Sequence, residues 1–162
     1  MDKRTAVYPG TFDPLTNGHL DIIERASQLF SRVIIAPVSS PSKNSLFNSD
    51  ERINIINEAV KNFSNCEVYG FEGLLVDFAA QKNAGVIIRG LRTFSDFEYE
   101  YQMALTNRKL SKQLETVFLM PSEKFAYISS TLVREIARYG GDVSMFIPEA
   151  ADKAVRKKFN SK

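Results

Sequence analysis

The chain has 162 residues, 44% of them apolar, which suits one globular domain with a single sizeable core. Twenty-one basic and nineteen acidic side chains leave a net charge of +2, too small to indicate a nucleic-acid or membrane partner by itself. One cysteine, Cys66, excludes an internal disulfide framework and a cysteine-rich zinc site. We therefore predict a single domain over residues 1–162 whose function depends on local clusters of side chains.

Short β-rich runs alternate with segments of helical periodicity along the chain. The runs predict five strands, at residues 5–8, 32–38, 66–71, 85–90 and 116–120. Apolar residues recur at helical spacing over residues 22–30 and 53–63, so each helix can bury one stripe. This alternation is typical of a parallel sheet covered by helices. We predict an α/β fold: a Rossmann-like, doubly wound sheet of five parallel strands, with helices on both faces and a C-terminal helical segment.

Several helix ends carry their own signals. Asn48 followed by Glu51, and Ser95 followed by Glu98, have the spacing of a capping box. The helix in ISSTLVREIARYG should stop at the two glycines from Gly140, and a final helix is predicted over residues 148–159.

The amino terminus, MDKRTAVYPG, lacks the apolar core of a signal peptide. No apolar run approaches the roughly 20 residues that a membrane-spanning helix needs. We expect a cytoplasmic protein that makes no membrane contact.

Polar residues gather just after the predicted strands. In a doubly wound sheet the ligand sits outside the carboxyl ends of the strands, where the strand order reverses, and the first strand normally takes part in that reversal. The side chains that follow the strands should therefore meet at one edge, and most of them are donors suited to phosphate oxygens. We expect a polyanionic ligand bound by Thr11, His19, residues 39–43, Arg89, Arg92 and residues 129–131.

His19 is the only histidine and follows Asn17-Gly18 where a loop turns into a helix. With Thr16 or Asn17 as the cap, His19 falls in the first helical turn and its ring should lean toward the sheet. A lone histidine is often a half-buried, satisfied side chain. A helix amino terminus, however, disfavours an imidazolium and welcomes an anion, so we prefer an N–H donor to phosphate. No Ser-His-Asp set is apparent, which argues against nucleophilic catalysis.

Several stretches resemble one known family. YPGTFDPLTNGHLDII resembles the first loop and helix of the nucleotidyltransferase superfamily marked by a (His or Thr)-x-Gly-His motif, here with Thr16 in the first position. ISSTLVRE, residues 128–135, resembles the second superfamily signature. SSPSKNSLF, IRGLRTFSDFEYEYQMALTNRKL and VFLMPSEKFAYISST are similar to the bacterial phosphopantetheine adenylyltransferases. The resemblance covers essentially the whole chain.

The resemblance implies transfer of the adenylyl group of ATP to 4′-phosphopantetheine, which gives 3′-dephospho-coenzyme A and pyrophosphate. A phosphate oxygen of the acceptor is already a nucleophile at neutral pH, so no covalent intermediate is needed. The main tasks are to hold two polyanions in line and to stabilise the charge that develops between them.

The resemblance also implies roles for individual residues. The expected catalytic residues are His19, Lys43 and Arg92. The expected contacts to the acceptor are Thr11, Lys43, Leu75 and Arg89. The expected contacts to ATP are Thr11, Phe12, His19, Gly90, Leu91, Arg92, Glu100, Phe125, Ala126, Tyr127, Ile128, Ser129, Ser130 and Thr131.

Each of these residues also has a plainer interpretation. Lys43 can be a solvated loop lysine and Leu75 a core residue. Arg92 and Glu100 can form an exposed charge pair of little energetic worth. Residues 129–131 can be no more than a helix cap, although spare hydroxyl groups beside amide donors also make a triphosphate cradle, which we prefer.

Magnesium is expected from the reaction, because the sequence contains no carboxylate cluster with metal spacing. Mg²⁺ often keeps several waters and binds mainly through phosphates, so we assign no metal ligand, with Asp13 only a candidate neighbour. The family also implies a homohexamer and feedback binding of coenzyme A. The apolar side chains of FSDFEYEYQMAL point to more than one helix face, and one face could form an interface.

Two other functions stay open at this point. The first is a related nucleotidyltransferase acting on nicotinamide mononucleotide or glycerol phosphate, although apolar Leu74 and Leu75 favour a longer acceptor. The second is a noncatalytic nucleotide- or RNA-binding module, against which the low net charge and the clustered basic residues count.

Overall fold

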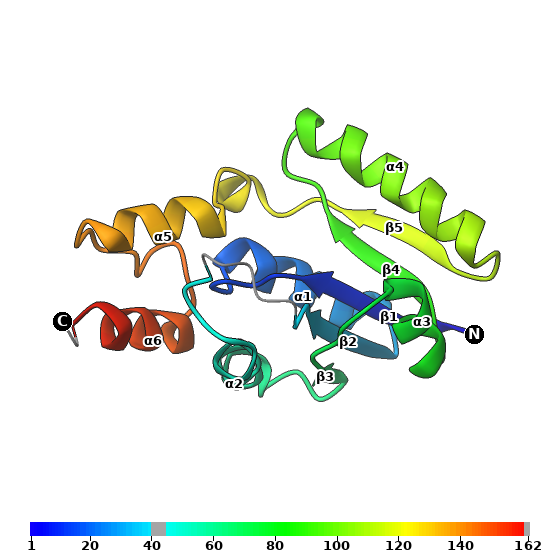
Figure 1. The fold of residues 1–162 in the computed structure, drawn as a ribbon, viewed down its shortest axis with the longest axis horizontal. Helices are drawn as coiled ribbons and strands as arrows, with labels where there is room; N and C mark the ends of the chain where they lie inside the picture. Colours follow the sequence, from blue (N-terminus) through cyan, green and yellow to red (C-terminus); the bar gives the residue numbers. More distant parts are fainter. Residues whose placement is uncertain (40–44, 161–162) are drawn as a thin grey trace.

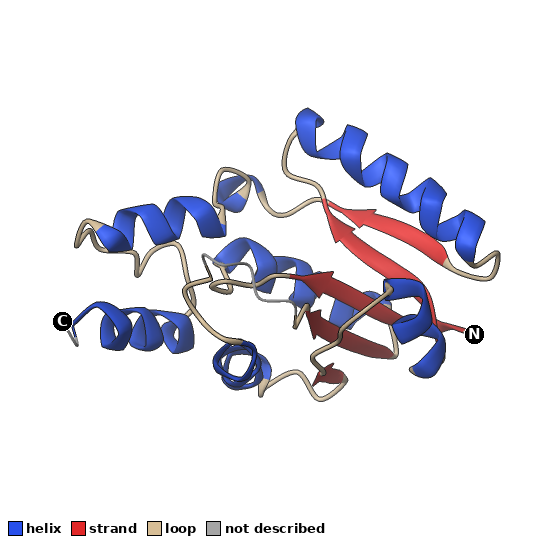
Figure 2. Ribbon diagram, viewed as in Figure 1, coloured by secondary structure: helices blue, strands red, loops and turns tan. Residues whose placement is uncertain are grey.

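A computed structural model describes residues 1–39 and 45–160 and contains one five-stranded sheet (Figures 1 and 2). All neighbouring strands are parallel and lie in the order β3-β2-β1-β4-β5. The order reverses between β1 and β4, so the predicted doubly wound sheet is confirmed. The strands are β1 Asp2–Gly10, β2 Arg32–Pro37, β3 Cys66–Val68, β4 Ala84–Gly90 and β5 Glu115–Leu119.

The central strands are apolar on both faces, because helices cover each face. Ala6 and Tyr8 of β1 belong to one buried cluster, which also contains residues of the first two helices. Val7 of β1 points the other way, into a second cluster with Phe78 and Ala79 of the third helix. This alternation follows from the two-residue period of a strand.

The helices lie on both faces of the sheet and beyond its carboxyl edge. α1 and α2 pack on the first face, α3 packs on the second, and α4 contacts α3 and β5. α5 and α6 lie side by side beyond the carboxyl ends of the strands (Figure 1). The predicted C-terminal helical segment is thus confirmed. The helices are α1 Asn17–Leu29, α2 Ser49–Val60, α3 Leu75–Gln81, α4 Phe94–Leu110, α5 Ser130–Arg138 and α6 Glu149–Asn160.

Two of the predicted helix boundaries can be compared directly with the caps. Asn48 and Glu51 form the expected capping box at α2. The prediction for α4 was wrong by two residues: Thr93, not Ser95, is the cap, because the Thr93 side chain accepts a hydrogen bond from the backbone N–H of Asp96. α6 begins directly after Pro148.

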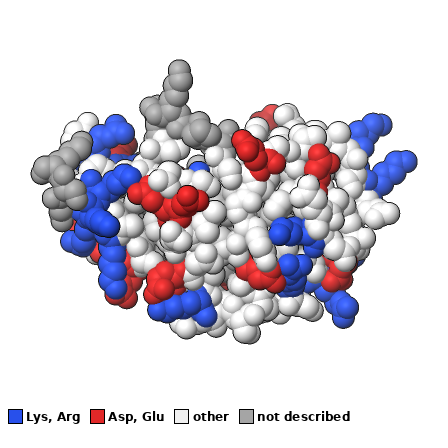
Figure 3. Space-filling model, turned by 60° about the horizontal axis from the view of Figure 1, so that its bottom comes forward, with Lys and Arg blue, Asp and Glu red and all other residues white. Residues whose placement is uncertain are grey.

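The surface mixes charges of both signs. On the face drawn in Figure 3, acidic and basic side chains lie beside one another over a largely uncharged surface. Within the part of the chain that the structure describes, no helix is long and apolar enough to span a bilayer.

Candidate active site

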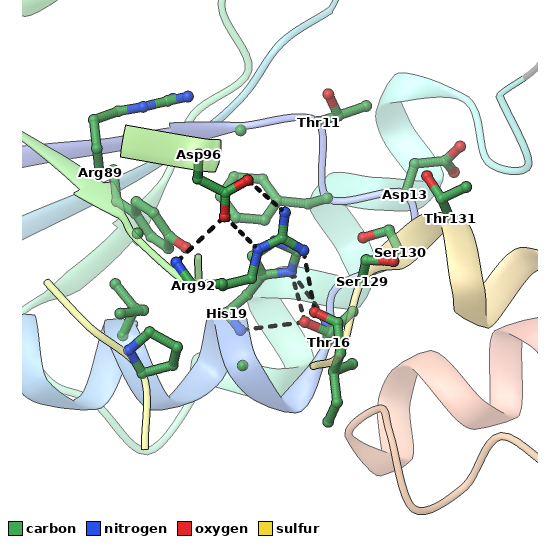
Figure 4. A pocket seen from close by; sticks show the side chains of 18 of the residues that line it. Thr11, Asp13, Thr16, His19, Arg89, Arg92, Asp96, Ser129, Ser130 and Thr131 are labelled. Carbon is green, nitrogen blue, oxygen red and sulfur yellow. Dashed lines mark hydrogen bonds and ion pairs between the residues drawn. The ribbon is translucent and has the colours of Figure 1, made fainter. Parts of the chain in front are cut away.

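A cavity of about 540 Å³ opens at the carboxyl ends of β1 and β4, where the strand order reverses (Figure 4). Its walls come from β1 and the loop after it, α1, β4, the start of α4 and the start of α5. Eleven residues predicted from the sequence line it: Thr11, Phe12, His19, Arg89, Gly90, Arg92, Glu100, Ile128, Ser129, Ser130 and Thr131.

The other predicted residues do not line this cavity. Leu75 packs against the core cluster beneath α3, and Lys43 lies outside the described residues. Leu91 continues from β4, and its N–H donates to Leu119. The remaining three residues precede the start of α5: Phe125, Ala126 and Tyr127. Phe125 packs on the core, and Tyr127 is largely exposed.

His19 is fixed by the cap of its own helix. Thr16 is the N-cap of α1, and its backbone N–H donates to Nδ1 of His19 over 3.0 Å. Because a backbone N–H can only donate, Nδ1 must accept, and the neutral ring carries its proton on Nε2. The Nε2–H is the donor that this ring can offer to a ligand.

The surroundings of His19 keep it neutral. Burial, and secondarily the nearby charge of Arg92, lowers the pKa of His19 from 6.5 to about 4. The ring packs edge-on against Phe12, with centroids 5.1 Å apart. At neutral pH, His19 is therefore an uncharged donor held in one orientation.

The turn after β1 is held by contacts on both sides. Phe12 has a positive φ of 50°, a region that residues with side chains seldom occupy. The buried carboxylate of Asp13 accepts the N–H groups of Leu46 and Phe47 at 2.8 and 2.9 Å. Arg134 of α5 donates to the carbonyl oxygen of Asp13. These contacts fix the backbone that carries Thr11 and Phe12 into the cavity.

Two arginines at the opposite wall are each paired with a carboxylate of α4. Arg89 forms two parallel hydrogen bonds of 2.5 Å to Glu100. Burial lowers the pKa of Arg89, but these bonds and the negative charge of Glu100 together raise it above its ordinary value. Arg92 pairs more loosely with Asp96, at 3.2 and 3.5 Å, and also donates to the carbonyl oxygen of Ile128. The plainer interpretation of Arg92 and Glu100 as an exposed pair was wrong, since Glu100 is buried against Arg89.

The start of α5 supplies main-chain donors. The Ser129 side chain caps the helix by accepting the N–H of Leu132, and the Ser130 hydroxyl donates to the carbonyl oxygen of Pro14. The Ser130 proton is thus engaged, whereas the Ser129 hydroxyl only accepts and keeps its own proton to donate. A phosphate here would also meet the first-turn N–H groups of Ser130 and Thr131, which an α-helix leaves without internal partners.

Comparisons with known proteins agree with this geometry. A family model described as Cytidylyltransferase-like matches residues 7–136. A phosphopantetheine adenylyltransferase of Alkaliphilus metalliredigens is 52% identical over 155 residues, which cover 96% of this chain and 99% of the relative. Another, of Hahella chejuensis, is also 52% identical over 155 residues, with 96% of each chain covered. The chain belongs to the phosphopantetheine adenylyltransferase family.

A solved structure supports the fold alone. This chain resembles the crystal structure of a protein described as a nicotinate-nucleotide adenylyltransferase from Vibrio parahaemolyticus. The match includes 96% of this chain and 93% of that protein. The TM-score is 0.72 at 18% identity. The sheet and its helices are thus shared with a nucleotidyltransferase fold, whereas the acceptor cannot be taken from so distant a relative.

This member of the phosphopantetheine adenylyltransferase family has cavity residues that the sequence did not indicate. Arg134 follows Ser130 by four residues, and Asp96 follows Arg92 by four, so helical spacing could have found both. Gly18 lines the cavity, and a Cβ at this position would stand 3.4 Å from the Phe125 carbonyl oxygen. The residues missed are Tyr8, Pro9, Gly10, Ile22, Asp96, Pro121 and Arg134, whereas Asp13, Thr16 and Gly18 were named from the sequence without being assigned a ligand contact.

The carboxylates in the wall are engaged with the protein. Asp13 accepts two backbone N–H groups, Asp96 pairs with Arg92, and Glu100 pairs with Arg89. In residues 1–39 and 45–160, no three or more of His, Cys, Asp and Glu cluster in a way that could hold a metal ion. The wall therefore suits a metal ion that arrives on phosphate oxygens and keeps its waters, as Mg²⁺ commonly does.

Proposed function

We propose that this protein transfers the adenylyl group of ATP to 4′-phosphopantetheine and releases pyrophosphate, with 3′-dephospho-coenzyme A as the other product. The observation that carries the proposal is the convergence of a neutral histidine donor, two arginines and a helix amino terminus on one cavity. The named relatives, which are 52% identical over nearly the full chain, supply the acceptor.

The reaction is a direct displacement at the α-phosphorus of ATP. An oxygen of the acceptor phosphate forms the new bond to phosphorus, while the bond to the bridging oxygen breaks and pyrophosphate leaves with its electron pair. His19 donates its Nε2–H to the α-phosphate as charge builds there. Because the ring is neutral and already oriented, this stabilisation needs no reorganisation at the moment of reaction.

Other donors serve the two ends of the reaction. Arg92 and the N–H groups at the start of α5 take the triphosphate, and Arg89, with Lys43, takes the acceptor phosphate. Glu100 orients Arg89 before substrate arrives, whereas Asp96 holds Arg92 more loosely, so that Arg92 can exchange this carboxylate for phosphate. The pantetheine arm is assigned to Leu75, and the full sets of ATP and acceptor contacts remain those expected from the sequence.

We propose that magnesium is bound by the phosphate oxygens of ATP rather than by side chains of the protein. When bound to the phosphates, it neutralises charge on the departing pyrophosphate. The residues of the chain orient the phosphates, and the engaged carboxylates of the wall support this division of roles.

We also propose a cytoplasmic homohexamer that binds coenzyme A as a feedback ligand. Support for assembly comes from α4, which exposes several large apolar side chains. Exposed apolar side chains of this kind commonly become buried between subunits. These side chains are Phe94, Phe97, Tyr99, Tyr101, Met103 and Leu105.

A pyrophosphate-release assay tests the proposed function. Purified protein with ATP and Mg²⁺ should release pyrophosphate with 4′-phosphopantetheine, and at most weakly with nicotinamide mononucleotide or glycerol phosphate. Lys43→Ala and Arg89→Ala should each weaken acceptor binding in calorimetry while ATP binding changes little. Release with one of the shorter acceptors alone would replace the proposed acceptor, and salt-sensitive RNA binding without any release would replace the enzyme by a binding module.

A further inference from the structure

Arg52 of α2 is 1% exposed and is the largest fully buried side chain among the described residues. The three hydrogen bonds that its guanidinium makes within residues 1–39 and 45–160 all go to main-chain carbonyl oxygens. Nη1 donates to Thr11 at 2.8 Å and to Val38 at 2.9 Å, and Nε donates to Asn48 at 3.3 Å. Burying a guanidinium costs free energy that its hydrogen bonds offset only in part, which suggests a role that an apolar side chain could not fill.

The bonds of Arg52 join two loops at the carboxyl edge of the sheet. Thr11 follows β1 and lines the cavity, whereas Val38 directly follows β2. Asp13 makes the reverse connection, because its carboxylate accepts N–H groups from Leu46 and Phe47 ahead of α2. The turn after β1 is therefore bound to its neighbours on both sides of Phe12.

Phe12 is the strained residue between these two anchors. Its φ of 50° persists only where surrounding contacts hold it, and such residues concentrate at functional sites. The Phe12 ring is 2% exposed and packs edge-on against Tyr8 and His19, with centroids 5.3 and 5.1 Å apart. The position of the His19 ring thus depends on the conformation of this turn.

We propose that Arg52 is a positioning residue for His19. By holding the carbonyl oxygen of Thr11, it keeps Phe12 in its left-handed conformation, and Phe12 in turn keeps the His19 ring in place. The kinetic consequence rests on the proposed function, whereas the effect on the His19 ring does not.

Three variants separate this role from a purely structural one. Arg52→Met removes the guanidinium and keeps an unbranched apolar stem. Arg52→Lys keeps the charge, but its side chain is one bond shorter and lacks the Nε–H group, so its ammonium falls short of the position from which Nη1 bonds both Thr11 and Val38. Ile56→Ala is the matched control, because Ile56 lies one turn further along α2, is fully buried and contributes to the core rather than to the cavity. Circular dichroism gives the midpoint temperature of unfolding of each variant, and both readouts are taken well below it.

The first readout is the NMR signal of His19, which is unambiguous because the chain has one histidine. Both Arg52 variants should shift the ring-proton resonances and move the pKa of His19 from about 4 toward 6.5, as a loosened Phe12 admits water. Arg52→Lys excludes loss of charge as the cause. Ile56→Ala should leave the His19 signals in place. An unchanged His19 spectrum in both Arg52 variants would overturn the proposal.

The second readout is pyrophosphate release with ATP and 4′-phosphopantetheine. Arg52→Met should lower kcat about tenfold or more, as misplacement of a catalytic group does, and should change KM for ATP by less than about threefold. In a His19→Ala background the same change should lower kcat by less than about threefold, because the group that Arg52 positions is already gone.

Three further outcomes reject the proposal: equal kcat losses in both backgrounds, a kcat for Arg52→Met close to wild type, or failure of both Arg52 variants to fold, since Arg52 would then serve the fold as a whole. Absence of pyrophosphate release from the wild type would instead reject the proposed function, and the His19 spectrum would still decide the role of Arg52.

Discussion

The two sides of the cavity present different kinds of donor. On the side of β1 and α1, His19 is neutral and is fixed by the main chain of Thr16 and by the ring of Phe12. On the side of β4 and α4, Arg89 and Arg92 are charged and are held by carboxylates. A neutral donor keeps its partner when substrate binds, whereas an ion-paired arginine must share its N–H groups with phosphate.

The charged side is itself uneven. Arg89 and Glu100 are mostly buried, with side-chain exposures of 28% and 11%, and form two short parallel bonds. Arg92 and Asp96 are 41% and 27% exposed, and their bonds are longer. We infer that the first pair builds the wall and that the second is free to exchange partners. Four changes test this contrast.

The largest effect should come from the neutral side. His19→Ala should lower kcat by about 10²-fold or more, because it removes a donor aimed at the charge of the transition state. ATP affinity, measured by calorimetry, should change by less than about threefold, since the arginines and the α5 amides remain. Near-normal turnover would show that His19 is only a packed core side chain.

The second effect concerns the buried pair. Glu100→Gln keeps the size of the side chain but leaves Arg89 without its counter-charge, so the unfolding free energy should fall by about 2–3 kcal/mol. Urea denaturation measures this fall. Glu98→Gln, at an exposed position of the same helix, is the matched control and should change stability by less than about 0.5 kcal/mol. Equal effects would mean that the Arg89 pair does not support the wall.

The fold was predictable because its signals are local. Short β-rich runs, helical periodicity and the capping pair of Asn48 and Glu51 depend on residues a few positions apart, and they predicted the strands and helices of the sheet. The start of α4 was misplaced because Thr93 and Ser95 are both acceptable caps, and only the path of the chain out of β4 selects between them.

The site was predictable only where residues follow a strand end. Arg89 could be placed at the cavity on that ground, but its pairing with Glu100 depends on how α4 crosses the sheet edge. Arg52 precedes Ile55 and Ile56 by three and four residues, so helical spacing puts it on the buried stripe of α2. The sequence does not show which acceptors Arg52 bonds, because these are carbonyl groups in two loops that are distant along the chain.

The third effect is the pH dependence of the neutral side. The pKa of His19 is lowered by burial to about 4, so kcat should not fall through titration of this ring between pH 8 and pH 6. Between pH 6.5 and 4 the unfolded chain binds the proton and the folded chain does not, so the unfolding free energy falls as pH is lowered. His19 can contribute at most about 1.4 kcal/mol per pH unit to this slope. Urea unfolding of wild type and His19→Gln across that window measures it, and equal slopes would contradict the neutral assignment.

The smallest effect should come from the exposed pair. Asp96→Asn removes a negative charge beside Arg92 and should change the unfolding free energy by less than about 1 kcal/mol, because exposed pairs contribute little. ATP affinity should rise a few-fold in calorimetry, since Arg92 no longer exchanges a carboxylate for phosphate. If Asp96→Asn instead destabilises the fold as much as Glu100→Gln and weakens ATP binding, Asp96 holds Arg92 in its binding position. The two pairs would then be alike, and both arginines would belong to a wall that is fixed before substrate enters.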